Sequence, residues 1–454
     1  MLGRKVKLVA KGLRGQIALQ IFLYERFNFG FKNVVLQSHY VALFCILEKR
    51  GCKHFNRLEF FFSKFCNLAE KYGLQHYVFN EAIYNLERHT KWYNYLDKIA
   101  AAATYLKHPA FAGHFLADEP SSSEMTEMRT AYKNYYNAFS QYYEDPSKLG
   151  SFINLLPNTA ALLSSDSSYN SYVKNYVENI AVNKDNVLGE DVLASGYVSY
   201  DHYPLKDSSI EAKHLRNLEI VAGYAKQYDL VFRAYIKASE TGDSERNLRK
   251  TQTINDLYMQ IYSALCFGVN EVIYYQFTDQ HAAIGSAGDG VINGATLDTT
   301  APVYQFAKQA NNEIHAFDAA YNNFKWKSVS VFHKSSSSWS QLTQFKNIEN
   351  NAGVYGYIAN VDSTNKANVL IGNFDNKKKD AGEGKYGDAY AYMIQNYGNT
   401  GSSQAESAIT ITFNGTPTRA LVYENGVAKV VTLTNNQLTL NLELGEGAFV
   451  IPLK

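Results

Sequence analysis

The stretch FAGHFLADEP, residues 111–120, constrains the fold of this chain more than any other. Most of its side chains up to Ala117 are apolar or small, as in a strand of a parallel sheet that is covered on both faces. Asp118 and Glu119 follow, and Pro120, which has no N–H to pair, ends the strand. Parallel sheets carry reactive groups where their strands end, on the carboxyl side. The stretch therefore predicts a buried strand that delivers two carboxylates to a sheet edge.

A helix is predicted directly after this strand. Residues 121–123 are serines, and Glu124 and Glu127 follow them. Serine is a preferred N-cap, and acidic side chains are favourable in the first turn of a helix. We expect Ser122 or Ser123 to cap a helix that continues over Met125 to Tyr143.

Similar units recur along the chain. Strands are predicted near residues 76, 113, 152, 198, 233 and 274, roughly 35 to 46 residues apart, and each gap has room for a helix. This order predicts a (β/α) barrel or a doubly wound sheet. A (β/α)8 TIM barrel is preferred, because polar residues end nearly every strand and no Gly-rich phosphate turn follows the first readable one.

The start of the chain limits this prediction. Two further strands are needed to close a barrel, and only residues 1–60 remain to hold them. Residues 1–57 match the repeating pattern poorly. The alternative is an incomplete barrel, whose open edge would expose unpaired backbone groups.

The pattern changes after Phe317. Helical periodicity stops, and short runs rich in β-formers appear, such as the alternating Leu438–Leu442. Residues 424–426 and 434–436 are typical of hairpin turns. We predict an α/β chain with a barrel over residues 1–320 and an antiparallel β-sandwich over residues 325–454.

Composition narrows the possible partners. The net charge is +1 with 19% charged residues, which excludes a polybasic nucleic-acid surface. No apolar run reaches the length of about 18 residues that a membrane-spanning helix needs. The 35 Tyr and 26 Phe suit stacking on sugar rings, and equally suit an aromatic-rich core. The basic N-terminus precedes an apolar run too short for a signal peptide, so no localisation follows from it.

The cysteines and histidines point away from a metal. Four cysteines show no C-x-x-C pair, so free and mostly buried thiols are expected rather than a zinc site or a disulfide framework. The 11 histidines lack H-E-x-x-H or a similar ligand spacing. We therefore predict no required metal and no cofactor; a calcium ion on an acidic loop is left open.

With these units placed, the chain resembles the retaining clan A glycoside hydrolases, in particular β-galactosidase-like barrels of polysaccharide-degrading bacteria that carry a β-sandwich. The resemblance covers residues 58–454. It is carried by AEKYGLQHYVFN (69–80), HPAFAGHFLADEPS (108–121), FINLLPN (152–158), YVSYDHYPL (197–205), the run at 257–277 and LELGEGAFVIPL (442–453). It implies a carbohydrate substrate and a secreted or periplasmic protein.

The resemblance also implies catalytic positions. Clan A enzymes carry the acid/base glutamate at the end of the fourth barrel strand and the nucleophile at the end of the seventh. Counted back from an eighth strand at 271–277, residues 111–120 are the fourth, which assigns the acid/base role to Glu119. Glu240, four residues beyond Ile236, is the nearest match for the nucleophile. Asp118 departs from the pattern, since many members have Asn there.

The residues themselves are consistent with these roles. Glycoside hydrolysis needs one protonated and one ionised carboxyl, and their separation decides between retention and inversion. A negative neighbour and partial burial suit a carboxyl that must hold a proton, as Glu119 would. The structural alternative is that Asp118 caps the next helix, Glu119 pairs with a basic residue, and Glu240 is a solvated loop residue.

Other polar residues at strand ends are candidates for binding the sugar. Asp201, His202 and Tyr203 end the sixth strand, and Asp201 is the second candidate for the nucleophile. The structural alternative is that Asp201 accepts a hydrogen bond from a neighbouring loop amide. Asn80 and Gln276 occupy equivalent positions, as do Glu81, Asn154 and Asp279. The resulting hypothesis is a retaining glycoside hydrolase; the alternative is a catalytically inactive barrel that binds carbohydrate.

Overall fold

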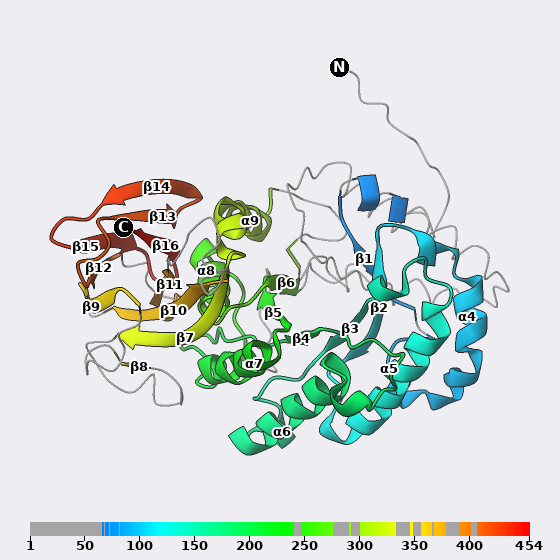
Figure 1. Ribbon diagram of the computed structural model, residues 1–454. Coiled ribbons are helices and arrows are strands. Elements are labelled where there is room, and N and C mark those ends of the chain that lie inside the picture. Colours follow the sequence, from blue (N-terminus) through cyan, green and yellow to red (C-terminus); the bar gives the residue numbers. More distant parts are fainter. Residues whose placement is uncertain are drawn as a thin grey trace. The chain divides into compact units, whose positions relative to one another are not determined.

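The computed structural model describes two compact units (Figure 1). Its described residues are 66–67, 69–71, 73–80, 82–239, 247–275, 290–291, 300–332, 346–347, 356–365, 367–377, 390–400 and 406–454. Those of the first unit fall within Met1–Ile153, Leu188–Leu193 and Gln276–Ala301, and those of the second within Asn154–Val187, Ala194–Tyr275 and Pro302–Lys454. Among these residues no helix is both long and apolar enough to span a bilayer.

The first unit is built around three neighbouring strands. They are β1 (His76–Val78), β2 (Phe111–Asp118) and β3 (Ser151–Asn154), in that order. β1 runs parallel to β2, which is buried along most of its length as predicted. The helical elements are η1 (Leu86–Arg88), η2 (Thr90–Tyr95), α4 (Leu96–Ala102), η3 (Thr104–Lys107), η4 (Ser122–Glu124), α5 (Met125–Ser140) and η5 (Pro146–Lys148).

The helix predicted after β2 is present, but the predicted N-cap residue is wrong. Ser121, not Ser122 or Ser123, caps the first turn, because its side chain and that of Glu124 form a capping box around η4. Helix α5 then buries Met128, Ala131 and Tyr135 with Phe139 on one side. The apolar spacing of the sequence therefore identified the buried face correctly.

A histidine lies in the middle of the buried strand. His114 is fully buried between the hydroxyls of Tyr105, 2.9 Å from Nε2, and Tyr135, 3.1 Å from Nδ1. Tyr135 donates its own proton to the carbonyl of Gly150. His114 must therefore carry its proton on Nδ1 and accept from Tyr105 at Nε2. Burial lowers the pKa of His114 to about 3, so the ring is neutral.

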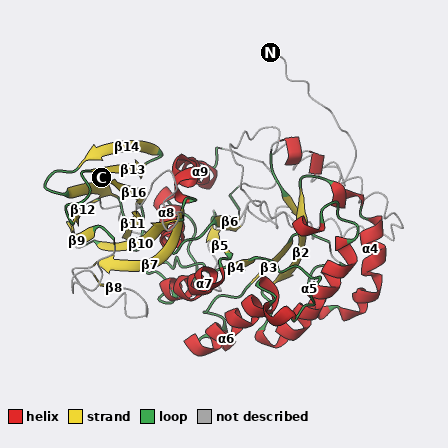
Figure 2. Ribbon diagram, in the orientation of Figure 1, coloured by secondary structure: helices red, strands yellow, loops and turns green. Residues whose placement is uncertain are grey.

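The second unit continues the parallel strand–helix order. β4 (Tyr197–Tyr200), β5 (Val231–Lys237) and β6 (Glu271–Tyr275) are parallel neighbours in chain order, and Leu155 forms a parallel bridge with Tyr200. The helical elements are η6 (Ala161–Leu163), α6 (Asp166–Tyr176), the π-turn η7 (Val177–Ala181), η8 (Lys184–Asn186), α7 (His214–Tyr228), α8 (Ile254–Cys266) and α9 (Pro302–Tyr321). Figure 2 shows this alternation of helix and strand.

All six parallel strands expected from the sequence are present. They form two three-stranded sheets among the described residues, and these sheets do not by themselves close a barrel. The two strands expected within residues 1–60 lie outside the described part of the chain. The structure establishes a mixed α/β chain, and the complete barrel stays a prediction.

The C-terminal region is largely antiparallel, as predicted. A seven-stranded sheet has the order β14-β13-β16-β11-β10-β7-β8, and a three-stranded sheet the order β15-β12-β9. The bounds are β7 (Phe324–Phe332), β8 (Lys346–Asn347), β9 (Ile358–Ser363), β10 (Asn368–Asn376), β11 (Tyr390–Tyr397), β12 (Ser407–Phe413), β13 (Arg419–Glu424), β14 (Val427–Thr432), β15 (Gln437–Leu442) and β16 (Gly447–Leu453). One apolar cluster, which includes Ile371, Ile394, Ile411 and Leu440, joins the two sheets.

Helix α8 is buried on every side. It contacts β5 of the parallel sheet and β10 and β11 of the large antiparallel sheet. Its polar residues are buried as well, and Gln260, for example, hydrogen-bonds to the backbone of Lys237 in both directions. The sequence predicted one shared apolar face for this helix; a second apolar face is covered because the antiparallel sheet packs on it.

The two cysteines in the described part of the chain have the state that the sequence predicted. Cys66 and Cys266 are free and buried. Cys45 and Cys52 lie outside the described residues.

Candidate active site

Glu119 leaves the sheet directly after β2 in an unusual backbone conformation. Its φ is +52°, in the left-handed region that few residues other than glycine adopt. Its side chain is partly exposed, and no hydrogen bond or ion pair to its carboxylate is found among the described residues. The carboxylate is thus available at the sheet edge. The structural alternative, in which Glu119 pairs with a basic residue, is not seen in this part of the chain.

Asp118 precedes Glu119 and is also partly exposed. Its backbone N–H donates to Oδ1 of Asn85 at 3.4 Å, and the N–H of Asn85 donates to the carbonyl of Leu116 at 2.6 Å. The end of β2 is therefore held by the segment that follows β1. The cap of the next helix is Ser121, so the capping role considered for Asp118 is filled by another residue.

A second carboxyl of the first unit was not identified from the sequence. Glu87 is buried, and both of its carboxylate oxygens lack a hydrogen-bond partner. Arg88 Nε lies 3.4 Å from its Oε1. Burial raises the pKa of Glu87 to about 7, which the nearby positive charge of Arg88 only partly offsets. No motif in the sequence marks Glu87, and its burial is seen only in the structure.

Asn80 is used by a local turn. Its Oδ1 accepts the N–H of Ala82 at 3.0 Å, and its carbonyl accepts the N–H groups of Ile83 and Tyr84. These hydrogen bonds fix the segment after β1. They use the side-chain oxygen of Asn80, whereas its side-chain NH2 group can donate to a ligand. Glu81, its neighbour, lies outside the described residues.

In the second unit, Asp201 is tied to a neighbouring amide. Asn154 donates from Nδ2 to Oδ1 of Asp201 at 3.1 Å, and Ser199 donates from Oγ to Oδ1 of Asn154 at 3.0 Å. Asp201 and Asn154 are buried. This geometry matches the structural alternative for Asp201, with the side chain of Asn154 in place of a loop amide. The role of Asp201 as second candidate for the nucleophile stays a prediction.

His202 lies in a buried polar cluster. Its Nδ1 is 3.0 Å from Oδ1 of Asn217, an acceptor that also takes the N–H of Asn158. Its ring meets that of His214 edge to face at 5.3 Å. Burial lowers the pKa of His202 to about 4, so the ring is neutral and donates from Nδ1. His202 thus supports the end of β4 from within the core.

Tyr203 is the partly exposed member of this group. Its ring stacks on that of Tyr275, with centroids 5.5 Å apart and planes at 25°. Tyr275 is the last residue of β6 and is also partly exposed. Two strand ends therefore present a joint aromatic surface. The sequence indicated Tyr203 but not its partner, because residues 72 positions apart give no local signal of contact.

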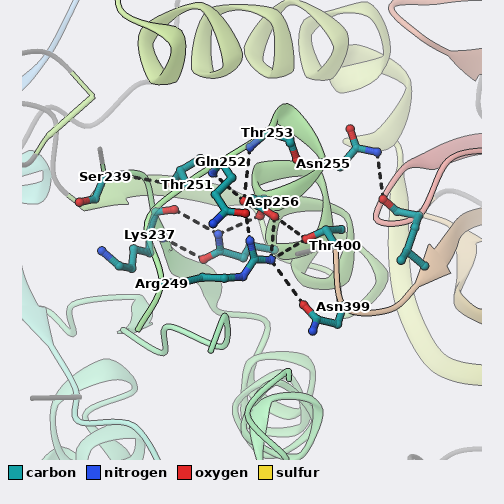
Figure 3. Close-up of polar contacts among 12 residues, drawn as sticks. Lys237, Ser239, Arg249, Thr251, Gln252, Thr253, Asn255, Asp256, Asn399 and Thr400 are labelled. Carbon is teal, nitrogen blue, oxygen red and sulfur yellow. Dashed lines mark hydrogen bonds and ion pairs between the residues drawn. The ribbon is translucent and has the colours of Figure 1, made fainter. Parts of the chain in front are cut away.

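Glu240 and Gln276 lie outside the described residues, as does Asp279. The residue before Glu240 is firmly placed. Ser239 N–H donates to Oγ1 of Thr251 at 3.1 Å, and Thr251 N–H donates to the carbonyl of Ser239 at 2.8 Å (Figure 3). The chain is thus fixed at the end of β5.

A buried ion pair supports this anchor. Arg249 donates two hydrogen bonds of 2.8 Å to Asp256, at the start of α8. Asp256 also accepts the N–H of Gln252 at 2.8 Å and the hydroxyl of Thr400 (Figure 3). The network connects the end of β5, the helix α8 and the antiparallel region.

The structure brings the candidates together in two groups. Asp118 and Glu119 lie in the first unit, and Asp201, His202 and Tyr203 lie in the second. In the described part of the chain no three His, Cys, Asp or Glu side chains are grouped so as to hold a metal ion.

Comparison with known proteins gives a result at the level of structure only. No family model and no curated protein matches the sequence. A β-galactosidase from Bacillus circulans sp. alkalophilus is similar over 98% of this chain and 97% of its own, with a TM-score of 0.51 and 8% identity. A GH30 endoxylanase from Clostridium papyrosolvens C71 is similar over 97% of this chain and 94% of its own, with a TM-score of 0.43 and 11% identity. The likeness to the β-galactosidase runs over nearly the whole of both chains, so the chain is similar to that enzyme in fold.

Proposed function

We propose that this protein is a retaining glycoside hydrolase, with Glu119 as acid/base and Glu240 as nucleophile. The observation that carries the proposal is the position of Glu119: a carboxylate without protein partners among the described residues, at the carboxyl end of a buried parallel strand. Carboxyl ends of parallel strands are where (β/α) folds place their chemistry. The similarity in fold to a β-galactosidase supports this assignment.

The proposal includes a complete barrel. The six described parallel strands follow one another in chain order, each beside the next within its sheet. A (β/α)8 barrel over residues 1–320 would place Glu119 and Glu240 at one rim, with a β-sandwich over residues 325–454. Residues before the first described strand would supply the two missing strands.

The reaction would proceed in two displacements. In the first, the Glu240 carboxylate attacks the anomeric carbon, the glycosidic C–O bond breaks, and Glu119 gives its proton to the departing oxygen. In the second, Glu119 takes a proton from water, whose oxygen attacks the anomeric carbon and releases Glu240. Both carboxyls then have their original protonation states, and the sugar keeps its anomeric configuration.

The remaining candidates would bind the sugar or support the site. The stacked rings of Tyr203 and Tyr275 suit the apolar face of a pyranose. Asp118, Asn80 and Gln276 would contact hydroxyl groups. Asp201 and His202 are buried, so we assign them to holding the end of β4 in place under Tyr203.

Substitution of Glu119 tests the proposal. Glu119→Gln should lower kcat/KM by about 100-fold or more on phenyl glycosides, the usual contribution of a general acid. The substrates would be phenyl β-galactoside, β-glucoside, β-xyloside and β-mannoside. The control is Glu127→Gln, an exposed glutamate on α5, which should keep full activity. Unchanged turnover by the Glu119→Gln protein would exclude the assigned role.

A binding protein without turnover is the second candidate. The aromatic surface of Tyr203 and Tyr275 would serve a lectin-like site equally well. Calorimetry with oligosaccharides and the same aryl glycosides separates the two functions. Binding that Tyr203→Ala abolishes, with no turnover by the wild-type protein, would favour the binding protein.

A further inference from the structure

We propose that Arg88 is a positioning residue for Glu119: through Glu124 and Ser121 it fixes the turn that presents the acid/base carboxyl. This inference rests on the proposed function. Arg88 does not belong to the strand–helix unit of Glu119, since it ends η1, after β1. Nothing in the local sequence around Glu119 points to it.

The contacts downstream of Glu119 converge on one carboxylate. Glu124 accepts hydrogen bonds from Arg88 Nε at 2.8 Å and Nη2 at 3.2 Å. The same carboxylate accepts the N–H and the Oγ–H of Ser121, both at 2.8 Å. Ser121 is two residues after Glu119. The bidentate guanidinium thus orients Glu124, which in turn holds the backbone after the turn.

The contacts upstream come from the same short segment. Asn85, three residues before Arg88, binds the carbonyl of Leu116 and the N–H of Asp118. One turn of the first unit therefore holds the chain on both sides of Glu119.

The backbone conformation of Glu119 has to be stabilised by surrounding contacts. Its left-handed φ is unfavourable for a side chain with a Cβ, and such conformations persist where surrounding contacts fix them. A general acid must also stay within hydrogen-bond reach of the leaving oxygen. Loosening the turn would let the backbone relax and move the carboxyl away from that position.

The charges around Arg88 match this role. Glu87 and Glu124 both lie against the guanidinium, at 3.4 and 2.8 Å from Nε. Arg88 is the positive group in this set of three, and its side chain is 39% exposed. An uncharged replacement is therefore compatible with folding, and its effect on the Glu119 turn is measurable.

The leaving group of the substrate distinguishes misplacement of the acid from general damage. A phenoxide leaving group needs protonation, whereas a dinitrophenoxide departs without it. Arg88→Gln should lower kcat/KM about 10-fold or more for phenyl β-galactoside and by less than about 3-fold for dinitrophenyl β-galactoside. Arg88→Lys keeps the charge without the fork and should recover part of the loss. The control is Arg129→Gln on α5, for which no ion pair is found in the described part of the chain; it should match the wild-type protein on both substrates.

Hydrogen exchange measures the turn without any substrate. With residue-level mass spectrometry, Arg88→Gln should speed exchange of the Ser121 amide about tenfold, because its acceptor Glu124 loses the guanidinium. The amide of Tyr135 in the middle of α5 should be unchanged.

Two results would overturn the inference. One is a kcat/KM of Arg88→Gln that falls equally for both galactosides or for neither of them. The other is unchanged exchange at Ser121. If the wild-type protein turns over none of the aryl glycosides, the proposed function fails; the exchange experiment then still decides whether Arg88 holds the turn.

Discussion

Arg249 and Asp256 form a bidentate ion pair that is almost completely inaccessible to water. The two hydrogen bonds, Nη1 to Oδ2 and Nη2 to Oδ1, are both 2.8 Å, and the side chains are 3% and 0% exposed. Asp256 also occupies position N3 of the capping box that Thr253 begins at the start of α8. A single carboxylate thus neutralises a buried cation and completes a helix cap.

Loss of this carboxylate should be strongly destabilising. Asp256→Asn leaves Arg249 as a buried charge without its counterion, which costs about 3–5 kcal/mol of the free energy of unfolding. Urea unfolding followed by circular dichroism measures it. Asp229→Asn makes the same chemical change in the exposed pair with Lys325, and should cost less than about 1 kcal/mol. Similar costs for the two variants would contradict the assignment of Asp256 as a structural anchor.

Glu446 makes the stability of the second unit depend on pH. Burial, and to a smaller extent the charges of Glu313, Glu443 and Glu424, raise the pKa of Glu446 to about 7. In the unfolded chain Glu446 ionises near its ordinary pKa of 4.5. Rising pH therefore lowers the free energy of the unfolded state more than that of the folded state. The stabilising effect of the protonated form is complete below pH 4.5 and is lost as the pH rises to about 7.

Glu446→Gln should remove this dependence. Relative to the wild-type protein, the variant should gain about 2 kcal/mol of unfolding free energy between pH 4.5 and pH 7.5. The glutamine oxygen still accepts the N–H of Glu443, which Glu446 binds at 2.8 Å. Urea titrations at several pH values provide the measurement, with the exposed Glu406→Gln as control. Parallel pH profiles for Glu446→Gln and the wild-type protein would refute this account.

Local patterns in the sequence were sufficient to place the regular elements. Strand β15 alternates between buried and exposed residues because only one of its faces meets the core, and the sequence alternates in the same way. Strands β10 and β11 are buried almost continuously, since helices cover the face that the small sheet leaves. Both patterns arise within a few residues; the alternation was predicted, whereas the continuous burial of β10 and β11 was not.

Contacts between distant residues were not predictable. Arg88 and Glu124 are separated by 36 residues, and neither belongs to a motif that indicates the other. The buried contacts of Asp201 and His202 likewise involve Asn154 at the end of β3 and Asn217 on α7, which the sequence at the end of a strand does not reveal. The sequence therefore identified the strand end with Glu119 but missed the residues that hold it.

His114 should make the first unit sensitive to acid. Its pKa is lowered to about 3 in the folded protein, whereas the unfolded ring takes up a proton near pH 6.5. The neutral ring therefore stabilises the fold fully above pH 6.5, and this contribution falls as the pH drops towards 3.

His114→Phe isolates this effect. When the pH is lowered from 6.5 to 5, the free energy of unfolding of the wild-type protein should fall by about 2 kcal/mol more than that of the variant. At neutral pH the variant is the less stable protein, because the hydroxyl of Tyr105 loses its hydrogen bond to the His114 ring. Chemical unfolding at both pH values checks the sign. Exposed His89→Phe, on the same unit, serves as control.

Two glycines should respond to alanine in opposite directions. Gly113 has a φ of +136°, and a Cβ added there would lie 2.0 Å from the carbonyl oxygen of Gly150. The neighbouring backbone cannot move by that amount without disturbing the pairing around β2, so Gly113→Ala should lower the free energy of unfolding by more than about 3 kcal/mol.

Gly223 lies within α7, and a Cβ there would meet nothing within 4 Å. Gly223→Ala should stabilise the protein by about 0.5–1 kcal/mol, because alanine loses less backbone entropy in a helix. Thermal unfolding of the two variants measures both effects, and a tolerated Gly113→Ala would show that β2 and Gly150 do not approach as closely as this structure has them.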